Sequence, residues 1–339
     1  MGNKTVLCSG TRGSGQVEYL ERVLTLLKHE EQLNIIDVGK KMEEISEERR
    51  KSVPRERFLD TGPMQEMLCG WAFERIKREI DGGPKDAVNV VVAHLSIRRR
   101  FALSPGCDVA SVKMLKPDMI VNIVDTIGEV QRRLSESNTW ARWNDISELI
   151  AWREEEILAS HLVAAYEDAA FYVIPHSEPR DTLYGLLFRG DLHRIYLSYP
   201  ITNLMKSERW EEFKPDLEAL RDTLRQHYVL FDPLSIKDLQ PLPTDIGEAD
   251  EQSLRAQTVL RDYRLIDQSD FLVVYYPEEA RSCGVMAEMR YAKQHGRPVY
   301  AVIHETSPFL PEFVDHPFET SEALLEHLQH KHKWEDKHG

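Results

Sequence analysis

The residues best suited to chemistry lie in the second half of the chain. Ser282 and Gly284 stand in a turn after an apolar run, and Glu288 follows one helical turn later. A serine beside a glycine at the start of a helix can offer a hydroxyl, backbone N–H groups and the helix dipole to one anion. Asp262 precedes the same apolar run. This pattern predicts an anion-binding turn beside two carboxylates.

A second anion-binding pattern lies near the amino terminus. Gly10, Gly13 and Gly15 surround a turn between a strand-like and a helical segment, where N–H groups and the helix dipole converge. The P-loop pattern continues with Lys, which contacts phosphate, and with Ser or Thr, which ligates Mg²⁺. Here Gln16 and Val17 take those places, and neither replaces a cation or a metal ligand. We expect either a degenerate nucleotide-binding loop or a tight turn in a scaffold domain.

Both patterns need parallel sheets to position them. Short apolar runs alternate with amphipathic helical stretches along the chain, which predicts α/β structure with parallel strands. The expected strands are 5–8, 34–38, 88–93, 119–124, 172–174, 194–198, 271–275 and 298–302. Ligands of such sheets bind beyond the carboxyl ends of the strands, so the acids and the turn at Gly284 should meet there.

We expect two successive three-layer domains. A length of 339 residues is typical of two domains, each able to bury its own core. The predicted boundaries are 1–175 for the first domain, 176–192 for a connector, 193–325 for the second domain and 326–339 for a polar tail. The tail is rich in His and Lys, and we expect it to be solvated rather than to bind metal.

The composition excludes several classes of function. The chain has 43 Lys and Arg against 57 Asp and Glu, and its net charge of −14 disfavours a chain-wide grip on nucleic acid or membrane. No apolar run approaches the length of a membrane span. The 4 cysteines show no metal-ligand spacing and indicate reduced thiols in a cytoplasmic protein. We therefore expect a small-molecule partner, and no nucleic acid, membrane, metal or cofactor.

The first half carries further segments in a recognisable order. After the glycine loop, they are 36–45, His94 after a strand, 115–121 and 129–134. Together they resemble the archaeal-type adenylate kinases over about residues 4–175, which implies a P-loop kinase-like fold. Val92 stands where that family has a strand-end acid, so the resemblance implies a degenerate nucleoside-monophosphate-kinase-like domain.

Four segments of the second half occur in register with another family. They are 195–201, Asp262 before the strand 271–274, 282–288, and 297–300. These segments resemble the nucleoside 2-deoxyribosyltransferase superfamily, including its 5′-nucleotide N-glycosidase branch, over about residues 193–305. The resemblance implies a flavodoxin- or Rossmann-like fold. Glu288 would be the nucleophile that forms a glycosyl-enzyme intermediate, and Asp262 the second acid, which positions the sugar or protonates the base.

The same resemblance implies the residues that bind substrate. They are Ser198, Tyr199, Pro200, Ser282 and Gly284. Tyr199 replaces the family's usual glycine, so its ring could narrow the pocket or stack on a base. At position 282 the transferase branch has an Asp that binds the free 5′-hydroxyl, whereas a serine leaves room for a 5′-phosphate and donates to it. The alternative for Ser282 is a helix cap alone.

From these residues we expect hydrolysis of the N-glycosidic bond of a nucleoside 5′-monophosphate to free base and sugar phosphate. Two alternatives stay open. One is base exchange by a nucleoside 2-deoxyribosyltransferase, and the other is a signalling module that binds nucleotide or binds or cleaves NAD. The family commonly completes its site across a subunit interface, so the resemblance also implies a homo-oligomer.

Overall fold

The structure, a computed structural model, describes residues 3–48, 63–99, 102–136, 145–201, 209–235, 246–277, 282–304 and 307–334. The chain divides into two compact units. The first unit is Met1–Arg180 with Ile236–Gln257, and the second is Asp181–Ser235 with Thr258–Gly339. Helix α10 (Glu248–Asp267) therefore begins in the first unit and ends in the second.

The first unit is built on a parallel sheet with the strand order β2-β3-β1-β6-β7. These strands are β2 (Leu33–Asp37), β3 (Val88–Val92), β1 (Lys4–Ser9), β6 (Met119–Val124) and β7 (Ala170–Pro175). Every residue of β3 and of β6 is buried, as expected of strands that helices cover on both faces. The five strands expected from the first half of the sequence are all present, and the α/β prediction is confirmed.

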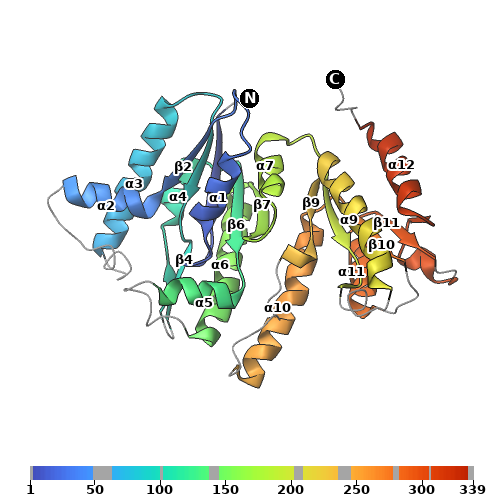
Figure 1. Ribbon diagram of the computed structural model, residues 1–339. Coiled ribbons are helices and arrows are strands. Elements are labelled where there is room, and N and C mark those ends of the chain that lie inside the picture. Colours follow the sequence, from blue (N-terminus) through green and yellow to red (C-terminus); the bar gives the residue numbers. More distant parts are fainter. Residues whose placement is uncertain are drawn as a thin grey trace. The chain divides into compact units, whose positions relative to one another are not determined.

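Helices and one short ladder complete the first unit (Figure 1). The helices are α1 (Gln16–Leu24), α2 (Val38–Glu48), α3 (Pro63–Gly82), α4 (Val109–Leu115), α5 (Ile127–Ser135) and α6 (Ile146–Glu167), and the antiparallel ladder pairs β4 (Ser96–Arg99) with β5 (Ala102–Pro105). Asp108, Thr126 and Asp145 cap α4, α5 and α6, because each side chain accepts a backbone N–H of the first turn.

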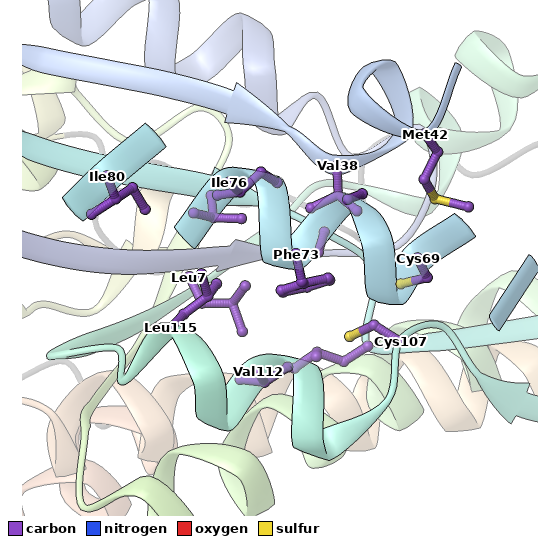
Figure 2. Packing of buried hydrophobic residues seen from close by; sticks show 14 of the residues in the cluster. Leu7, Val38, Met42, Cys69, Phe73, Ile76, Ile80, Cys107, Val112 and Leu115 are labelled. Carbon is purple, nitrogen blue, oxygen red and sulfur yellow. The ribbon is translucent and has the colours of Figure 1, made fainter. Parts of the chain in front are cut away.

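The largest core of the first unit lies between α3, α4 and the sheet. Figure 2 shows Phe73 and Ile76 of α3 among Leu7 of β1, Val38 of α2 and Val112 of α4. Phe73 is completely buried. Truncating it to Ala would cost about 3 to 5 kcal/mol, because the loss of transfer free energy and the cavity add. This packing fixes the helices that follow the ends of β2 and β3.

The second unit has its own parallel sheet, with the order β12-β11-β10-β8-β9. The strands are β8 (Arg194–Ser198), β9 (Val229–Phe231), β10 (Phe271–Tyr276), β11 (Val299–Ile303) and β12 (His316–Phe318). Numbered along the chain, this order is 2-1-3-4-5, which is the flavodoxin-like arrangement. The predicted flavodoxin- or Rossmann-like fold of the second domain is thus confirmed. The sequence analysis missed β9 and β12, which have only 3 residues each.

The remaining elements differ from the expected connector and tail. They are α7 (Arg180–Phe188), α9 (Trp210–His227), α11 (Cys283–Gln294), α12 (Ser321–His332) and the 3₁₀ turns η3 (Pro233–Ser235) and η4 (Leu310–Glu312). Residues 176–192, expected to connect the domains, contain α7, whose side chains from Thr182 to Leu187 are buried. Helix α12 continues through residues 326–332 of the expected tail, because Leu324 and Leu328 bury its inner face.

The end of the described chain is also packed. The Trp334 ring stacks on His227 with centroids 4.0 Å apart, and its indole N–H donates to the Tyr228 hydroxyl at 2.9 Å. No helix of the described ranges has both the length and the apolar character that a bilayer crossing requires. All four cysteines are free thiols, three of them buried and Cys283 exposed.

Candidate active site

The glycine loop of the first unit connects β1 to α1, as the P-loop pattern requires. Gly15 caps α1 in the left-handed conformation with φ 75°, and no side chain caps this helix. A Cβ at Gly15 would lie 2.7 Å from the His176 ring, so only glycine fits this position. The loop therefore keeps the backbone geometry of an anion-binding turn.

Several side chains around this loop bond to its backbone carbonyls, whereas the buried Ser14 hydroxyl has no hydrogen-bond partner among the described residues. The Gln16 side-chain amide donates to the Gly10 carbonyl at 3.0 Å, and His94 Nδ1 lies 2.6 Å from the same oxygen. Arg133 donates to the Gly13 carbonyl at 2.8 Å and pairs with the buried Asp125 at 2.7 Å. Arg133, a cation beside this turn, thus already has a carboxylate partner, while Arg12 of the turn itself lines the neighbouring cavity. A cavity of about 220 Å³ lies beside the loop, lined by Gly13, Gln16 and His94 among others.

Glu156 of α6 is a buried carboxylate that the sequence analysis missed. Its oxygens accept the backbone N–H groups of Leu95 at 2.8 Å, Ser96 at 2.6 Å and Gly10 at 3.4 Å, and also the Ser96 hydroxyl. Burial raises the pKa of Glu156 to about 7, although these hydrogen bonds oppose the rise. The residue ties the start of the glycine loop to the segment after β3.

The second unit brings Glu288 against the end of β8. Glu288 lies on α11, which follows β10, and two hydroxyls of β8 donate to it: Tyr196 to Oε1 at 3.3 Å and Ser198 to Oε2 at 2.5 Å. Tyr196 and Ser198 are two residues apart, so they face the same side of the sheet. Both are completely buried. The carboxyl of Glu288 is therefore held at the carboxyl end of a central strand.

Asp262 lies close enough to change the ionisation of Glu288. Asp262 stands on α10, where the neighbouring Arg261 donates Nε and Nη2 to its Oδ1 at 3.0 and 2.8 Å. Burial first, and then the charge of Asp262, raise the pKa of Glu288 to about 8, while the bonds from Ser198 and Tyr196 and the Arg261 charge oppose this. The structure thus brings together the two acids that the sequence analysis paired.

This site lies at the point where the strand order of the second sheet reverses. Strands β8 and β10 are neighbours in the sheet, and β9 lies beyond β8 on the other side. In open α/β sheets ligands bind in the crevice at this switch point, outside the carboxyl ends of the strands. Ser198 is the last residue of β8, and Glu288 lies on α11, the helix that follows β10. The fold therefore places both residues where a ligand binds.

Tyr199 does not face this site as the sequence analysis expected. Its ring belongs to the core that α9 covers, and its hydroxyl donates to Asp232 at 2.9 Å and accepts from Arg221 at 2.9 Å. Burial, followed by the charge of Asp232, raises the Tyr199 pKa far above its usual range. The reason is alternation: Ser198 turns toward Glu288, so the next residue turns to the opposite face. Pro200 is buried beside it.

At the turn before α11 the structure shows Ser282 as the helix cap, and its binding of phosphate stays a prediction. Its Oγ accepts the Val285 N–H at 3.4 Å as the helix cap, and its own N–H donates to the Tyr276 hydroxyl at 2.9 Å. Because the hydroxyl accepts in the capping bond, its hydrogen can still be donated. Among the described residues, which leave out 278–281 just before this turn, a Cβ at the exposed Gly284 would meet only Ser282 Oγ, at 3.9 Å.

Sequence reasoning missed two members of the site. Tyr196 lies two residues before Ser198, and strand alternation could have assigned it to the same face. Arg261 lies directly before Asp262, but adjacent helical residues do not face each other in general, so spacing alone gives no signal for their pairing.

In comparisons with known proteins, the chain matches solved structures only. No protein-family model and no curated protein sequence matches the chain. Among solved structures, a shikimate kinase from Acinetobacter baumannii in complex with shikimate is 12% identical with a TM-score of 0.36, over 56% of this chain and 96% of that one. A sugar kinase from Janibacter sp. HTCC2649 is 15% identical with a TM-score of 0.31, over 54% and 91% of the two chains.

A shikimate kinase from Bacteroides thetaiotaomicron is 14% identical with a TM-score of 0.31, over 51% of this chain and 86% of that one. The fold assignments for the two units rest on their own strand orders.

Proposed function

We propose that the second unit hydrolyses the N-glycosidic bond of a nucleoside 5′-monophosphate and releases the free base and the sugar phosphate. The observation that carries this proposal is the pair of carboxylates, Glu288 and Asp262, at the switch point of a flavodoxin-like sheet. The resemblance of residues 193–305 to the nucleoside 2-deoxyribosyltransferase superfamily supports the same reaction.

The chemistry requires two acids with different tasks. Cleavage of an N-glycosidic bond passes through an oxocarbenium-like sugar, which a carboxylate stabilises by attacking the anomeric carbon. We assign this attack to Glu288, whose oxygens the Ser198 and Tyr196 hydroxyls orient. Asp262, ionised in its pair with Arg261, accepts a hydrogen bond from the sugar hydroxyl, and the departing base takes its proton from water. Water then breaks the glycosyl-enzyme bond and restores the Glu288 carboxylate.

The protonation of the site determines when this attack can occur. Glu288 attacks only as a carboxylate, and its pKa is raised to about 8. The fraction of reactive protein therefore increases as pH rises through about 8. If Glu288 were instead a general acid, activity would fall through the same range. The direction of the pH profile thus tests the role of Glu288.

The turn at Ser282 is the proposed phosphate site. The Ser282 hydroxyl hydrogen, the N-terminal N–H groups of α11 and the exposed backbone at Gly284 can all act on one anion. A 5′-phosphate bound there would place the sugar toward Glu288, which lies farther along the same helix. This is the reason for proposing a monophosphate rather than a nucleoside as substrate.

Incubation with a panel of nucleosides, 5′-monophosphates and NAD, with free base measured by chromatography, tests the proposal. We expect free base and sugar phosphate from a monophosphate, and none from the Glu288→Gln variant. Base release that requires a second, acceptor base would show the transferase instead. Release from NAD alone would favour the signalling alternative. An absence of base from every substrate would contradict the assignment of Glu288 and Asp262.

A further inference from the structure

The Arg261 side chain is the positive charge within the candidate active site. It lies on α10, is only 9% exposed, and directs both Nε and Nη2 at one oxygen of Asp262. A guanidinium removed from water needs a partner of opposite charge, and Asp262 provides it. The pair is thus fixed beside Glu288 before any substrate binds.

Without this charge the site would hold two carboxylates with few compensating donors. Among the described residues, the groups that act on Glu288 are Tyr196 and Ser198 from β8 and Asp262 and Arg261 from α10. The two hydroxyls are neutral and donate one hydrogen bond each. Two nearby carboxylates repel, and burial strengthens the repulsion. Arg261 is the one group of these four that carries positive charge.

We propose that Arg261 is a positioning residue for the reaction: its guanidinium orients the Asp262 carboxylate and balances its charge, so that Glu288 can ionise beside it. Only the kinetic consequence of this proposal rests on the proposed function. Its electrostatic consequence concerns Glu288 itself and can be measured without any substrate. Arg261 acts through Asp262 and needs no contact with the reacting atoms.

The test compares three variants. Arg261→Gln removes the charge but keeps a donor for Asp262, Arg261→Lys keeps the charge, and Arg264→Gln is the control on the same helix. Carbon-13 NMR of glutamate-labelled protein, with the Glu288 signal assigned by its loss in Glu288→Gln, gives the titration midpoint of Glu288. We expect Arg261→Gln to raise this midpoint by about one pH unit or more, while Arg261→Lys and Arg264→Gln leave it nearly unchanged.

The kinetic arm uses the monophosphate substrate. We expect kcat of Arg261→Gln at pH 7 to fall about tenfold with a smaller change in KM, the pH profile to move in the same direction as the midpoint, and Arg261→Lys to recover most of the activity. If Arg261→Gln does not fold by circular dichroism, Arg261→Met, which also removes the charge and keeps an apolar side chain of similar reach, supplies the same comparison.

The outcomes separate the two proposals. An unchanged Glu288 midpoint in folded Arg261→Gln overturns the role of Arg261, whether or not base is released. A shifted midpoint with no base release from any substrate supports the role of Arg261 and contradicts the proposed function. A shifted midpoint together with a parallel shift in the activity profile supports both.

Discussion

Each unit places a glutamate near the carboxyl end of its central strands, but Glu156 is fully buried and Glu288 only partly so, and their surroundings differ. Glu156 accepts three backbone N–H groups and one hydroxyl, so its charge is distributed over fixed donors. Glu288 accepts two hydroxyls and lies near a second carboxylate. Burial raises the pKa of both. Glu156 therefore has more hydrogen-bond donors than Glu288, the carboxylate that we propose to be the nucleophile.

The glycine turns of the two units differ in the same way. The Gly10 and Gly13 carbonyls of the first turn accept side chains of its own unit, from Gln16 and Arg133. Ser282 and Gly284 form the second turn, which has a hydroxyl hydrogen to donate and an exposed glycine. The first turn also keeps one hydroxyl with hydrogen-bonding capacity, because the buried Ser14 Oγ has no hydrogen-bond partner among the described residues.

The sharpest test of this comparison is a pair of amide substitutions. We expect Glu288→Gln to reduce base release by at least about a thousandfold, because the amide cannot attack the sugar as the carboxylate does. Glu156→Gln should leave kcat/KM within about threefold, because its donors serve the first unit only. Rates measured on the monophosphate at several pH values decide this. Comparable losses in the two variants would show that the distinction between them is wrong.

The largest stability effect is expected at Glu156. Glu156→Ala leaves the N–H groups of Leu95 and Ser96 buried without an acceptor, so it should lower the free energy of unfolding by about 3 kcal/mol or more. Chemical denaturation followed by circular dichroism measures this. Glu155→Ala, one residue earlier on the same helix, is the control, and we expect a smaller loss there because Glu155 is less buried and pairs with Arg98.

We expect the turn at Ser282 and Gly284 to distinguish phosphorylated from unphosphorylated substrates by their charge. Ser282→Asp places a carboxylate where the 5′-phosphate would bind, and repulsion at this distance should lower kcat/KM for the monophosphate by roughly a hundredfold. Use of the unphosphorylated nucleoside should be spared, because its 5′-hydroxyl can donate to the new acid. A matched nucleoside and monophosphate pair measures the ratio. If the ratio stays the same in Ser282→Asp, Ser282 is only a helix cap.

A smaller effect concerns stability against pH. Folded Glu288 stays protonated up to about pH 8, whereas in the unfolded chain it ionises near its ordinary value of 4.5. Between these values the folded state binds more protons, so its stability falls as pH rises from about 4.5 to 8. We expect Glu288→Gln to gain at least about 2 °C in Tm relative to wild type at pH 8, and little at pH 4. An equal difference at both pH values would contradict this.

The smallest expected change is at the first turn. Gln16→Lys restores the cation of a P-loop but not the metal ligand, since Val17 has no hydroxyl, so no ADP should form from ATP and AMP with Mg²⁺. The wild-type protein should also form none. Production of ADP that depends on either protein would show that this turn retains phosphoryl-transfer chemistry.

The strands of both sheets could be predicted where apolar runs are long. Val88–Val92 and Met119–Val124 are apolar runs interrupted by a single asparagine each, and the structure has strands at the expected places. Strand β9 is too short to show a pattern, and its pairing with β8 depends on tertiary contacts. The sequence analysis missed helix α7, because Pro, Gly and charged residues flank its apolar core. That composition led to the prediction of a connector.

For the candidate site, the sequence predicted several of the residues that form it but not the arrangement of their side chains in space. Glu288, Asp262 and Ser198 meet because parallel strands bring their carboxyl ends to one edge, which the pattern implies. Matching sequence segments could not predict which way the Tyr199 side chain points, because this depends on the face of the sheet that each residue at the end of β8 occupies. The pairing of Arg261 with Asp262 required the actual side-chain geometry.

Helix α10 has a consequence for biosynthesis. Leu254 is completely buried in a cluster with Ile127, Leu149 and Trp152, and this cluster belongs to the first unit. On the ribosome, residues 181–235 of the second unit emerge before Leu254 does, so the first unit cannot complete this cluster when its own amino-terminal residues leave the tunnel. Nascent chains that stop before residue 254 would keep the apolar side chains of α5 and α6 uncovered. The first unit therefore cannot finish folding before part of the second unit has been translated. A chaperone could bind the nascent chain between these two events.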